Sequence, residues 1–97
     1  METLGLTCYR IYTEDIVHRH ELNDLIRRYF ADFTLLRGTG YFHQVGEPCV
    51  IIEILLADSE LQRVIHLAGD IRHVFHQQQV LVTEHPVKGH IIVSQTA

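Results

Sequence analysis

The chain has 97 residues, of which 46% are hydrophobic and 21% are charged, and its formal net charge is −4. This length predicts a single domain (residues 1–97), and the composition argues against disorder, which needs low hydrophobicity and high charge. The acidic balance disfavours nucleic acid as a partner, because phosphate binding needs a basic surface. The longest apolar run, residues 50–57, is interrupted by Glu53 and is too short to span a bilayer. No signal peptide is recognisable, so we expect a cytoplasmic protein.

The first two predicted elements are a strand and a helix. Residues 4–12 carry β-branched and aromatic residues in weak alternation, which is typical of a strand. Residues 19–31 then change period and predict a helix. Its apolar residues fall on one helical face: Leu22, Leu25, Ile26 and Tyr29.

Residues 32–58 predict a β-hairpin. In its first strand, Gly38-Thr39-Gly40 indicates a bulge or a close backbone approach. The segment Gly46-Glu47-Pro48 predicts the turn, because glycine and proline interrupt strands. The second strand, residues 49–57, is apolar except for Glu53.

A second helix and the last strands complete the chain. Asp58 predicts the N-cap of a helix that ends near Gln77. Residues 80–83 predict a strand that ends at Glu84-His85-Pro86, and residues 90–93 predict a short extra strand. The predicted buried face of the helix consists of Leu61, Val64, Ile65, Ala68, Ile71 and Phe75.

The element order β-α-β-β-α-β predicts an α+β, ferredoxin-like sandwich. In that fold a four-stranded antiparallel sheet carries two helices on one face. The strands have apolar residues at nearly every position, for example in residues 50–55, whereas a sheet with one wet face should alternate. We therefore expect a homo-oligomer in which a second copy covers the other face of the sheet, with ligand sites at the subunit contacts.

Two acidic residues are candidates for a functional site. A carboxylate within an apolar strand is costly unless something pairs with it. Glu53 therefore either pairs with an arginine across the sheet or the oligomer interface, or serves as a pocket carboxylate that meets a cation or acts as a base. Glu84 is either an exposed acid at a strand end or frames one site together with Glu53.

Two further candidates are an aromatic residue and an arginine. Tyr41 follows Gly40, so the backbone beside it can approach a ligand closely. Its ring either contacts a ligand or packs within the hairpin. Arg72 lies near the apolar stripe of the second helix and either extends its charge to solvent or reaches Glu53 or a ligand carboxylate.

The cysteines and histidines do not predict a metal site. Cys8 and Cys49 lie in apolar, strand-like runs, where free cysteines behave as small hydrophobic residues. The histidines of the second helix have neither cysteines nor carboxylates at the spacing of a known zinc motif. We expect no metal and no disulfide.

Three stretches carry a likeness to known proteins: TCYRIYTED, LLRGTGYFHQVGEPCVIIEIL and DIRHVFHQQQVLVTEHPV. In these stretches the chain resembles the small phage-encoded enzymes that degrade S-adenosylmethionine, which are themselves PII-like trimers. The resemblance implies a lyase reaction without a cofactor. In that reaction the carboxylate of the substrate attacks its own γ-carbon and releases methylthioadenosine and homoserine lactone. By position in these stretches, the resemblance implies Tyr41 and Glu53 as catalytic candidates and Glu84 as a substrate-binding candidate. Further substrate-binding candidates are Gly38, Gly40, Phe42 and Arg72.

Two other functions stay open. The layout also resembles the trimeric PII-like signalling proteins, which bind nucleotides in clefts between subunits, so the chain is alternatively a sensor of an adenine nucleotide without turnover. It lacks their long loop between the second and third strands and their basic phosphate-binding residues, and Lys88 is its only lysine. A third possibility is an assembling protein with no ligand.

Overall fold

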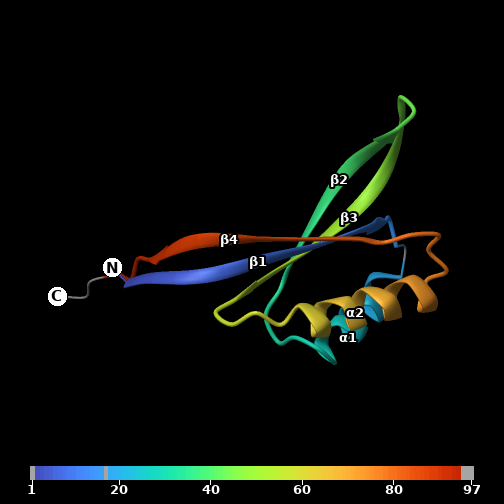
Figure 1. Ribbon diagram of the computed structural model, residues 1–97. Coiled ribbons are helices and arrows are strands. Elements are labelled where there is room, and N and C mark those ends of the chain that lie inside the picture. The colour runs from blue at the N-terminus through green and yellow to red at the C-terminus, as the bar shows by residue number, and fades with distance from the viewer. Residues whose placement is uncertain (1, 17, 95–97) are drawn as a thin grey trace.

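The computed structural model describes residues 2–16 and 18–94, and its sheet has the strand order β2-β3-β1-β4 with antiparallel pairing throughout. Both helices lie on one face of the sheet (Figure 1). This arrangement confirms the predicted α+β, ferredoxin-like fold. The elements are β1 (Glu2–Glu14), α1 (Arg19–Arg27), β2 (Thr34–Phe42), β3 (Val45–Leu56), α2 (Leu61–Val74) and β4 (Leu81–Ile91). No helix in the described ranges is long and apolar enough to cross a membrane.

The core forms where alternate strand residues meet the helices. Ile11 lies opposite Ile52, and Tyr9 lies opposite Ile54, and all four are fully buried. Successive side chains of a strand point to opposite faces, so this set fixes which residues face the helices. The helices contribute their own apolar stripes to the same core: Leu22, Leu25, Ile26, Val64, Leu67, Ala68 and Ile71.

The predicted buried face of α2 was wrong at one position. Ile65 is 42% exposed, whereas Leu67, which the prediction left out, is fully buried. Leu67 lies three residues after Val64 and four before Ile71, so these three share one face of the helix. Ile65 is rotated off that face.

The predicted ends of α2 also differ from the structure. Asp58 does not cap the helix: the N-cap is Glu60, which makes no side-chain capping bond. The buried Tyr9 hydroxyl group instead accepts a hydrogen bond from the Glu60 backbone nitrogen at 3.1 Å. A side chain from the sheet therefore satisfies a donor at the start of the helix. The helix ends at Val74, before Gln77.

A Schellman motif ends α2. The Gln77 nitrogen donates to the Arg72 carbonyl oxygen at 2.9 Å, and the His76 nitrogen donates to the His73 carbonyl oxygen at 3.4 Å. His76 takes the position of this motif that is usually glycine, with a φ of 55°.

Because a side chain at positive φ is strained, we expect His76→Gly to raise the free energy of unfolding by about 1 kcal/mol. Urea unfolding of the variant and the wild type measures this difference. His73→Gly is the control: it replaces a histidine inside the helix, where glycine lowers stability by about 1 kcal/mol. A His76→Gly variant that loses stability would contradict the prediction.

The turn of the β2–β3 hairpin is not where it was predicted. The hairpin reverses at His43 and Gln44, whose φ angles are 49° and 69°. Positive φ at both central residues is the signature of a two-residue type I′ turn, which suits the twist of paired strands. Gly46-Glu47-Pro48 lies within β3 instead.

The predicted bulge at Gly38 and Gly40 is also absent. The β2–β3 ladder runs without interruption from the Thr34–Glu53 pair to the Phe42–Val45 pair. A two-residue turn sets this register from the tip of the hairpin. The described glycines all have negative φ, so none of them supplies an unusual backbone conformation.

Neither proline interrupts the strand that contains it. The Pro48 carbonyl oxygen points toward β1 and accepts a bond from the Asp15 nitrogen at 3.1 Å, beyond the end of the β1–β3 ladder at the Glu14–Cys49 pair. Pro86 lies opposite Thr7 in β4, which is an edge strand. An edge strand turns every second N–H to solvent, and a proline at such a position removes no bond from the ladder. The predicted break at residues 84–86 and the separate short strand at residues 90–93 are therefore replaced by one continuous strand, β4.

Two arms extend from the helix-covered body (Figure 1). One is the ribbon of β1 and β4 near the chain ends, where residues 2–6 pair with β4 and not with β3. The other is the tip of the β2–β3 hairpin. Two-stranded ribbons are marginally stable in water when isolated.

Candidate ligand-binding groove

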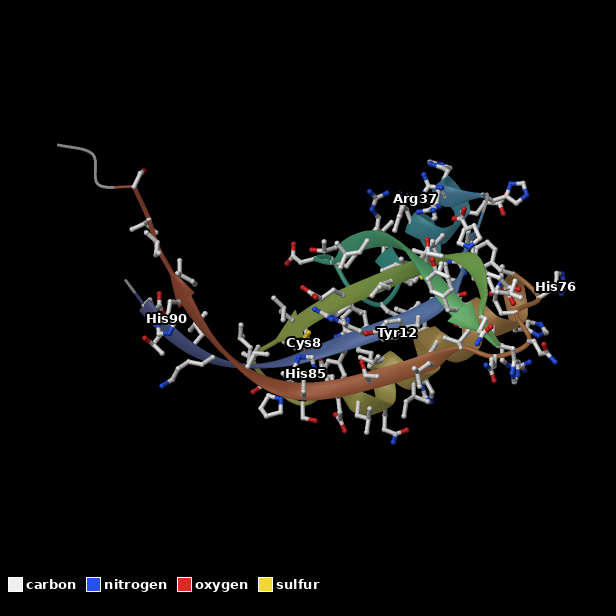
Figure 2. The ribbon with its side chains drawn as sticks, turned by 90° about the horizontal axis from the view of Figure 1, so that it is seen from above. Cys8, Tyr12, Arg37, His76, His85 and His90 are labelled. Carbon is white, nitrogen blue, oxygen red and sulfur yellow. The ribbon has the colours of Figure 1, made fainter. Side chains whose placement is uncertain are left out.

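The sheet has a second face that no helix covers, which we call the open face; Figure 2 looks down on it. The register assigns to it Cys8, Arg10 and Tyr12 of β1 together with their neighbours on β3 and β4. Several large apolar side chains of this face are exposed: Leu36 by 40%, Leu55 by 50% and Leu81 by 59%. The open face is thus apolar without being covered by this chain.

An ion pair lies among these apolar residues. The Arg10 Nη2 and Nε atoms each lie 3.0 Å from Oε2 of Glu53, directly across the β1–β3 ladder. Of the two alternatives for Glu53, a cross-sheet arginine partner is the one present in the single chain. The Tyr12 hydroxyl group and the Glu53 carboxylate together raise the pKa of Arg10 above its ordinary value. Glu53 is therefore a paired charge, linked through Arg10 to Tyr12.

A groove of about 470 Å³ lies where the outer half of the β2–β3 hairpin extends past the end of β1 and the start of β4. One wall comes from β1, another from the hairpin, and a third from the segment that leads into β4. Its lining residues are Tyr12, Thr13, Glu14, Gly40, Tyr41, Glu47, Pro48, Cys49, Gln79, Val80 and Leu81.

The lining of the groove combines aromatic and acidic side chains. Tyr12 and Tyr41 are its two aromatic residues, and Glu14 and Glu47 are its two carboxylates. Among the described residues that line the groove, none is a lysine or an arginine. A groove of this kind suits a ligand that has a flat ring and a positive charge, because aromatic faces stack on rings and carboxylates attract cations.

An ion-pair cluster holds the middle of β2 near the start of α1. Oδ1 of Asp15 lies 2.5 Å from Nη2 of Arg19, and its Oδ2 lies 3.2 Å from Nη2 of Arg37 in β2. Hydrogen bonds from Arg19, and to a smaller extent from Arg37, keep the pKa of Asp15 below its usual range. Because the Asp15 nitrogen also bonds Pro48, this cluster fixes β2 and β3 beside the end of β1.

The structure brings two of the predicted site residues into the groove. Tyr41, which is 73% exposed, and Gly40 both line it. The glycine that gives the Tyr41 ring its room is Gly46: a Cβ atom there would lie 3.0 Å from Cε1 of Tyr41. Gly38 lies two pairs beyond Gly40 along the β2–β3 ladder, where a Cβ atom would meet Sγ of Cys49 at 3.4 Å. Phe42 pairs with Val45 through its backbone, and its side chain lies outside what the structure describes.

The other predicted residues lie elsewhere in the single chain. Glu84 is opposite Tyr9 on the side of the sheet that faces the helices, whereas Glu53 is on the open face. The two carboxylates therefore do not frame one site, because neighbouring residues directly across a ladder share a face. Arg72 is exposed on α2, across the sheet from Glu53, and does not reach it.

Sequence reasoning missed Glu14, Glu47 and Gln79 as groove residues. Glu14 lies beyond the predicted first strand, residues 4–12, and Glu47 was assigned to the hairpin turn. A type I′ turn at His43 and Gln44 would have placed Glu47 inside β3, but histidine and glutamine carry no strong signal for that turn.

Cys8 and Cys49 are both free. Cys8 lies beside His85 across the β1–β4 ladder (Figure 2). Burial raises the pKa of the Cys8 thiol, and the Glu53 charge adds to this effect. Within residues 2–16 and 18–94, no group of three or more histidine, cysteine, aspartate or glutamate side chains is arranged to hold a metal ion.

Comparison with known proteins identifies the fold class. No family model matches the chain, and no curated protein matches it. One similar solved structure is that of CPII, a nitrogen regulatory PII-like protein from Thiomonas intermedia K12, bound to ADP, AMP and bicarbonate. It aligns with a TM-score of 0.61 and 16% identity, over 95% of this chain and 100% of that one. The chain therefore has a PII-like fold.

Two more solved structures share this fold. A phage S-adenosylmethionine lyase in complex with S-methyl-5′-thioadenosine aligns with a TM-score of 0.64 and 18% identity, over 94% of this chain and 95% of that one. A DUF3240 family protein from Shewanella baltica OS155 aligns with a TM-score of 0.63 and 11% identity, over 92% and 97% of the two chains. At these identities the likeness concerns the fold.

Proposed function

We propose that this protein is an S-adenosylmethionine lyase that releases 5′-methylthioadenosine and homoserine lactone. The observation that carries the proposal is the lining of the groove, which has two tyrosines, two carboxylates and no basic side chain. S-adenosylmethionine offers an adenine ring and a sulfonium cation, which match those two kinds of side chain. The fold shared with a phage S-adenosylmethionine lyase adds to this argument.

In the reaction, the carboxylate oxygen of the substrate attacks its own γ-carbon and forms the lactone ring. The bond between that carbon and sulfur breaks, and its electron pair stays on sulfur as a neutral thioether. The substrate supplies both the nucleophile and the leaving group, so the protein needs neither a nucleophile nor a cofactor. Holding the reacting atoms in line provides the rate enhancement, which reaches roughly 7–11 kcal/mol in favourable cases.

The carboxylates of the groove have a defined place in this scheme. The positive charge on sulfur disappears as the bond breaks, so Glu14 and Glu47 attract the substrate more strongly than the transition state. Interactions of that kind lower KM and do not raise kcat. Tyr12 and Tyr41 stack on the adenine ring, and Glu53 acts through Arg10, which orients the Tyr12 hydroxyl group.

We further propose that the protein is a homotrimer whose grooves are completed at the subunit contacts. Leu81 supports this because it belongs both to the groove and to the apolar open face. A second copy on the open face would bury Leu36, Leu55 and the ion pair of Arg10 and Glu53. Glu84 and Arg72 would meet a ligand only in such an assembly. Native mass spectrometry distinguishes a trimer from a monomer.

The second candidate function is a sensor that binds ADP or AMP without turnover. The PII-like CPII structures with bound ADP and AMP favour it. The absence of lysine and arginine from the groove weighs against it, because phosphate groups are usually held by basic side chains.

Incubation of the pure protein with S-adenosylmethionine is expected to yield methylthioadenosine, detected by liquid chromatography and mass spectrometry. Glu53→Gln is expected to lower turnover, because it weakens the ion pair that holds Arg10 beside Tyr12. Calorimetric titration with ADP and AMP tests the sensor. Absence of both product and S-adenosylmethionine binding would refute the lyase, and full activity of Glu53→Gln would remove Glu53 from the mechanism.

A further inference from the structure

One buried glutamine, Gln77, connects two walls of the groove. Its Oε1 atom accepts hydrogen bonds from the Thr13 hydroxyl group at 2.9 Å and from the Glu14 backbone nitrogen at 3.0 Å. Its Nε2 atom donates to the Phe75 carbonyl oxygen at 3.2 Å. Gln77 is 7% exposed and Thr13 is 4% exposed, so these bonds form away from solvent.

The partners of Gln77 belong to different parts of the groove. Thr13 and Glu14 line it at the end of β1, and residues 79–81 line it two residues after Gln77. The β1–β4 ladder stops at the Tyr12–Leu81 pair, so residues 78–80 have no ladder partner on β1. The hydrogen bonds of Gln77 extend the connection between the two segments beyond that point.

The backbone of Gln77 is fixed as well as its side chain. Its nitrogen closes the Schellman motif on Arg72, immediately after the left-handed residue His76. His76 marks this end of the molecule in Figure 2. Gln77 therefore connects the end of α2 to the end of β1.

We propose that Gln77 is a positioning residue that sets the distance between the β1 wall of the groove and the wall formed by residues 79–81. Substrate affinity depends on that distance. The ligand part of this proposal rests on the proposed lyase function. Glutamine suits the position because one end of its side chain must accept two bonds while the other end donates one. An ionised glutamate has no donor for the Phe75 carbonyl oxygen, and leucine can form none of the three bonds.

The test compares Gln77→Glu with Gln78→Glu at pH 8. The two variants carry the same added charge, and Gln78 is exposed and outside the groove. If Gln77 sets the wall spacing, Gln77→Glu raises the KM for S-adenosylmethionine roughly tenfold and leaves kcat within about twofold of the wild type, since misplacement of a binding wall weakens uniform binding. Gln78→Glu leaves both constants unchanged. A general loss of folded protein would lower the apparent kcat and leave KM as it is.

Cys49 supplies a second readout that needs no substrate. It is a free, half-buried thiol in the groove, whereas Cys8 is buried. Iodoacetamide labelling, resolved by peptide mass spectrometry, is expected to be several-fold faster at Cys49 in Gln77→Glu than in Gln78→Glu. The added negative charge disfavours the reactive thiolate, so charge alone would slow the labelling.

The outcomes distinguish a failure of the lyase proposal from a failure of the proposed role of Gln77. If the wild type neither cleaves nor binds S-adenosylmethionine, the lyase proposal fails, and the Cys49 labelling rates alone decide on Gln77. Equal labelling rates in the two variants, or an unchanged KM in an active Gln77→Glu enzyme, overturn the positioning role. If Gln77→Glu does not fold, Thr13→Val removes one partner of Gln77 and Thr13→Ser retains it. Faster Cys49 labelling in Thr13→Val alone then supports the proposal, and equal rates overturn it.

Discussion

Ile52→Ala is expected to lower the free energy of unfolding by about 2–5 kcal/mol, because it removes three carbon atoms from a fully buried side chain and leaves a cavity. Ile52 lies opposite Ile11 on β1 and Leu35 on β2, so it contributes to the packing of the central strands against the helices. A domain of this size has a total stability of about 5–15 kcal/mol, so the variant loses a large part of it. Urea unfolding followed by circular dichroism measures the change.

Leu55→Ala on the same strand is the matched control. Leu55 is 50% exposed on the open face, so its truncation is expected to cost less than about 1 kcal/mol in an isolated chain. If a second copy covers the open face, Leu55→Ala instead weakens association, and its unfolding midpoint comes to depend on protein concentration. Equal losses in the two variants at high dilution would contradict the assignment of Ile52 to the core and Leu55 to the open face.

The fold could be predicted because its elements follow simple periodicities. The i, i+3, i+4 spacing of Leu22, Leu25 and Ile26 predicted α1, and these residues are buried as expected. In the structure, Val50 and Ile52 face the helices and Glu53 faces the open side of the sheet, as the two-residue period of a strand requires. These patterns are local consequences of helix and strand geometry, so the sequence alone is sufficient to read them.

The details that failed depend on neighbours that a local pattern does not contain. Pro86 is usually a sign that a strand ends, but here it lies in an edge strand, where its missing N–H group removes no bond. The turn at His43 and Gln44 uses residues with little preference for it, while Gly46, next to it, provides room for Tyr41. The turn preference of Gly46-Glu47-Pro48 was therefore not decisive, and this segment lies within β3.

The candidate site was predicted only in part for the same reason. Tyr41 and Gly40 were identified from their adjacent positions on one strand, and they line the groove. The partner of Glu53 is Arg10, which lies 43 residues away in the sequence and becomes its neighbour through the β1–β3 register. Glu14, Glu47 and Gln77 gain their positions from the same long-range pairing.

Charge reversal in the groove is expected to weaken substrate binding strongly. Under the proposed lyase function, Glu47→Lys replaces an attraction to the sulfonium cation of the substrate with a repulsion. Each unit charge at about 6 Å in a solvated groove contributes roughly 0.7 kcal/mol, so the change of two units raises KM about tenfold. Measuring KM for methylthioadenosine release at low and high ionic strength tests this, because salt should reduce the effect. Glu14→Lys is expected to act in the same direction, since Glu14 lines the groove from β1.

Glu2→Lys separates an effect of the groove from an effect of net charge. Glu2 is exposed and belongs to the same strand as Glu14, but it is twelve residues away, at the other end of β1. Glu2→Lys changes the net charge of the chain by the same amount as Glu47→Lys. It is expected to leave KM unchanged, because exposed charges further apart than a Debye length of about 8–10 Å are screened. An equal rise of KM in Glu2→Lys and Glu47→Lys would assign the effect to overall charge. An unchanged KM in both Glu47→Lys and Glu14→Lys would show that the substrate cation does not bind in the groove.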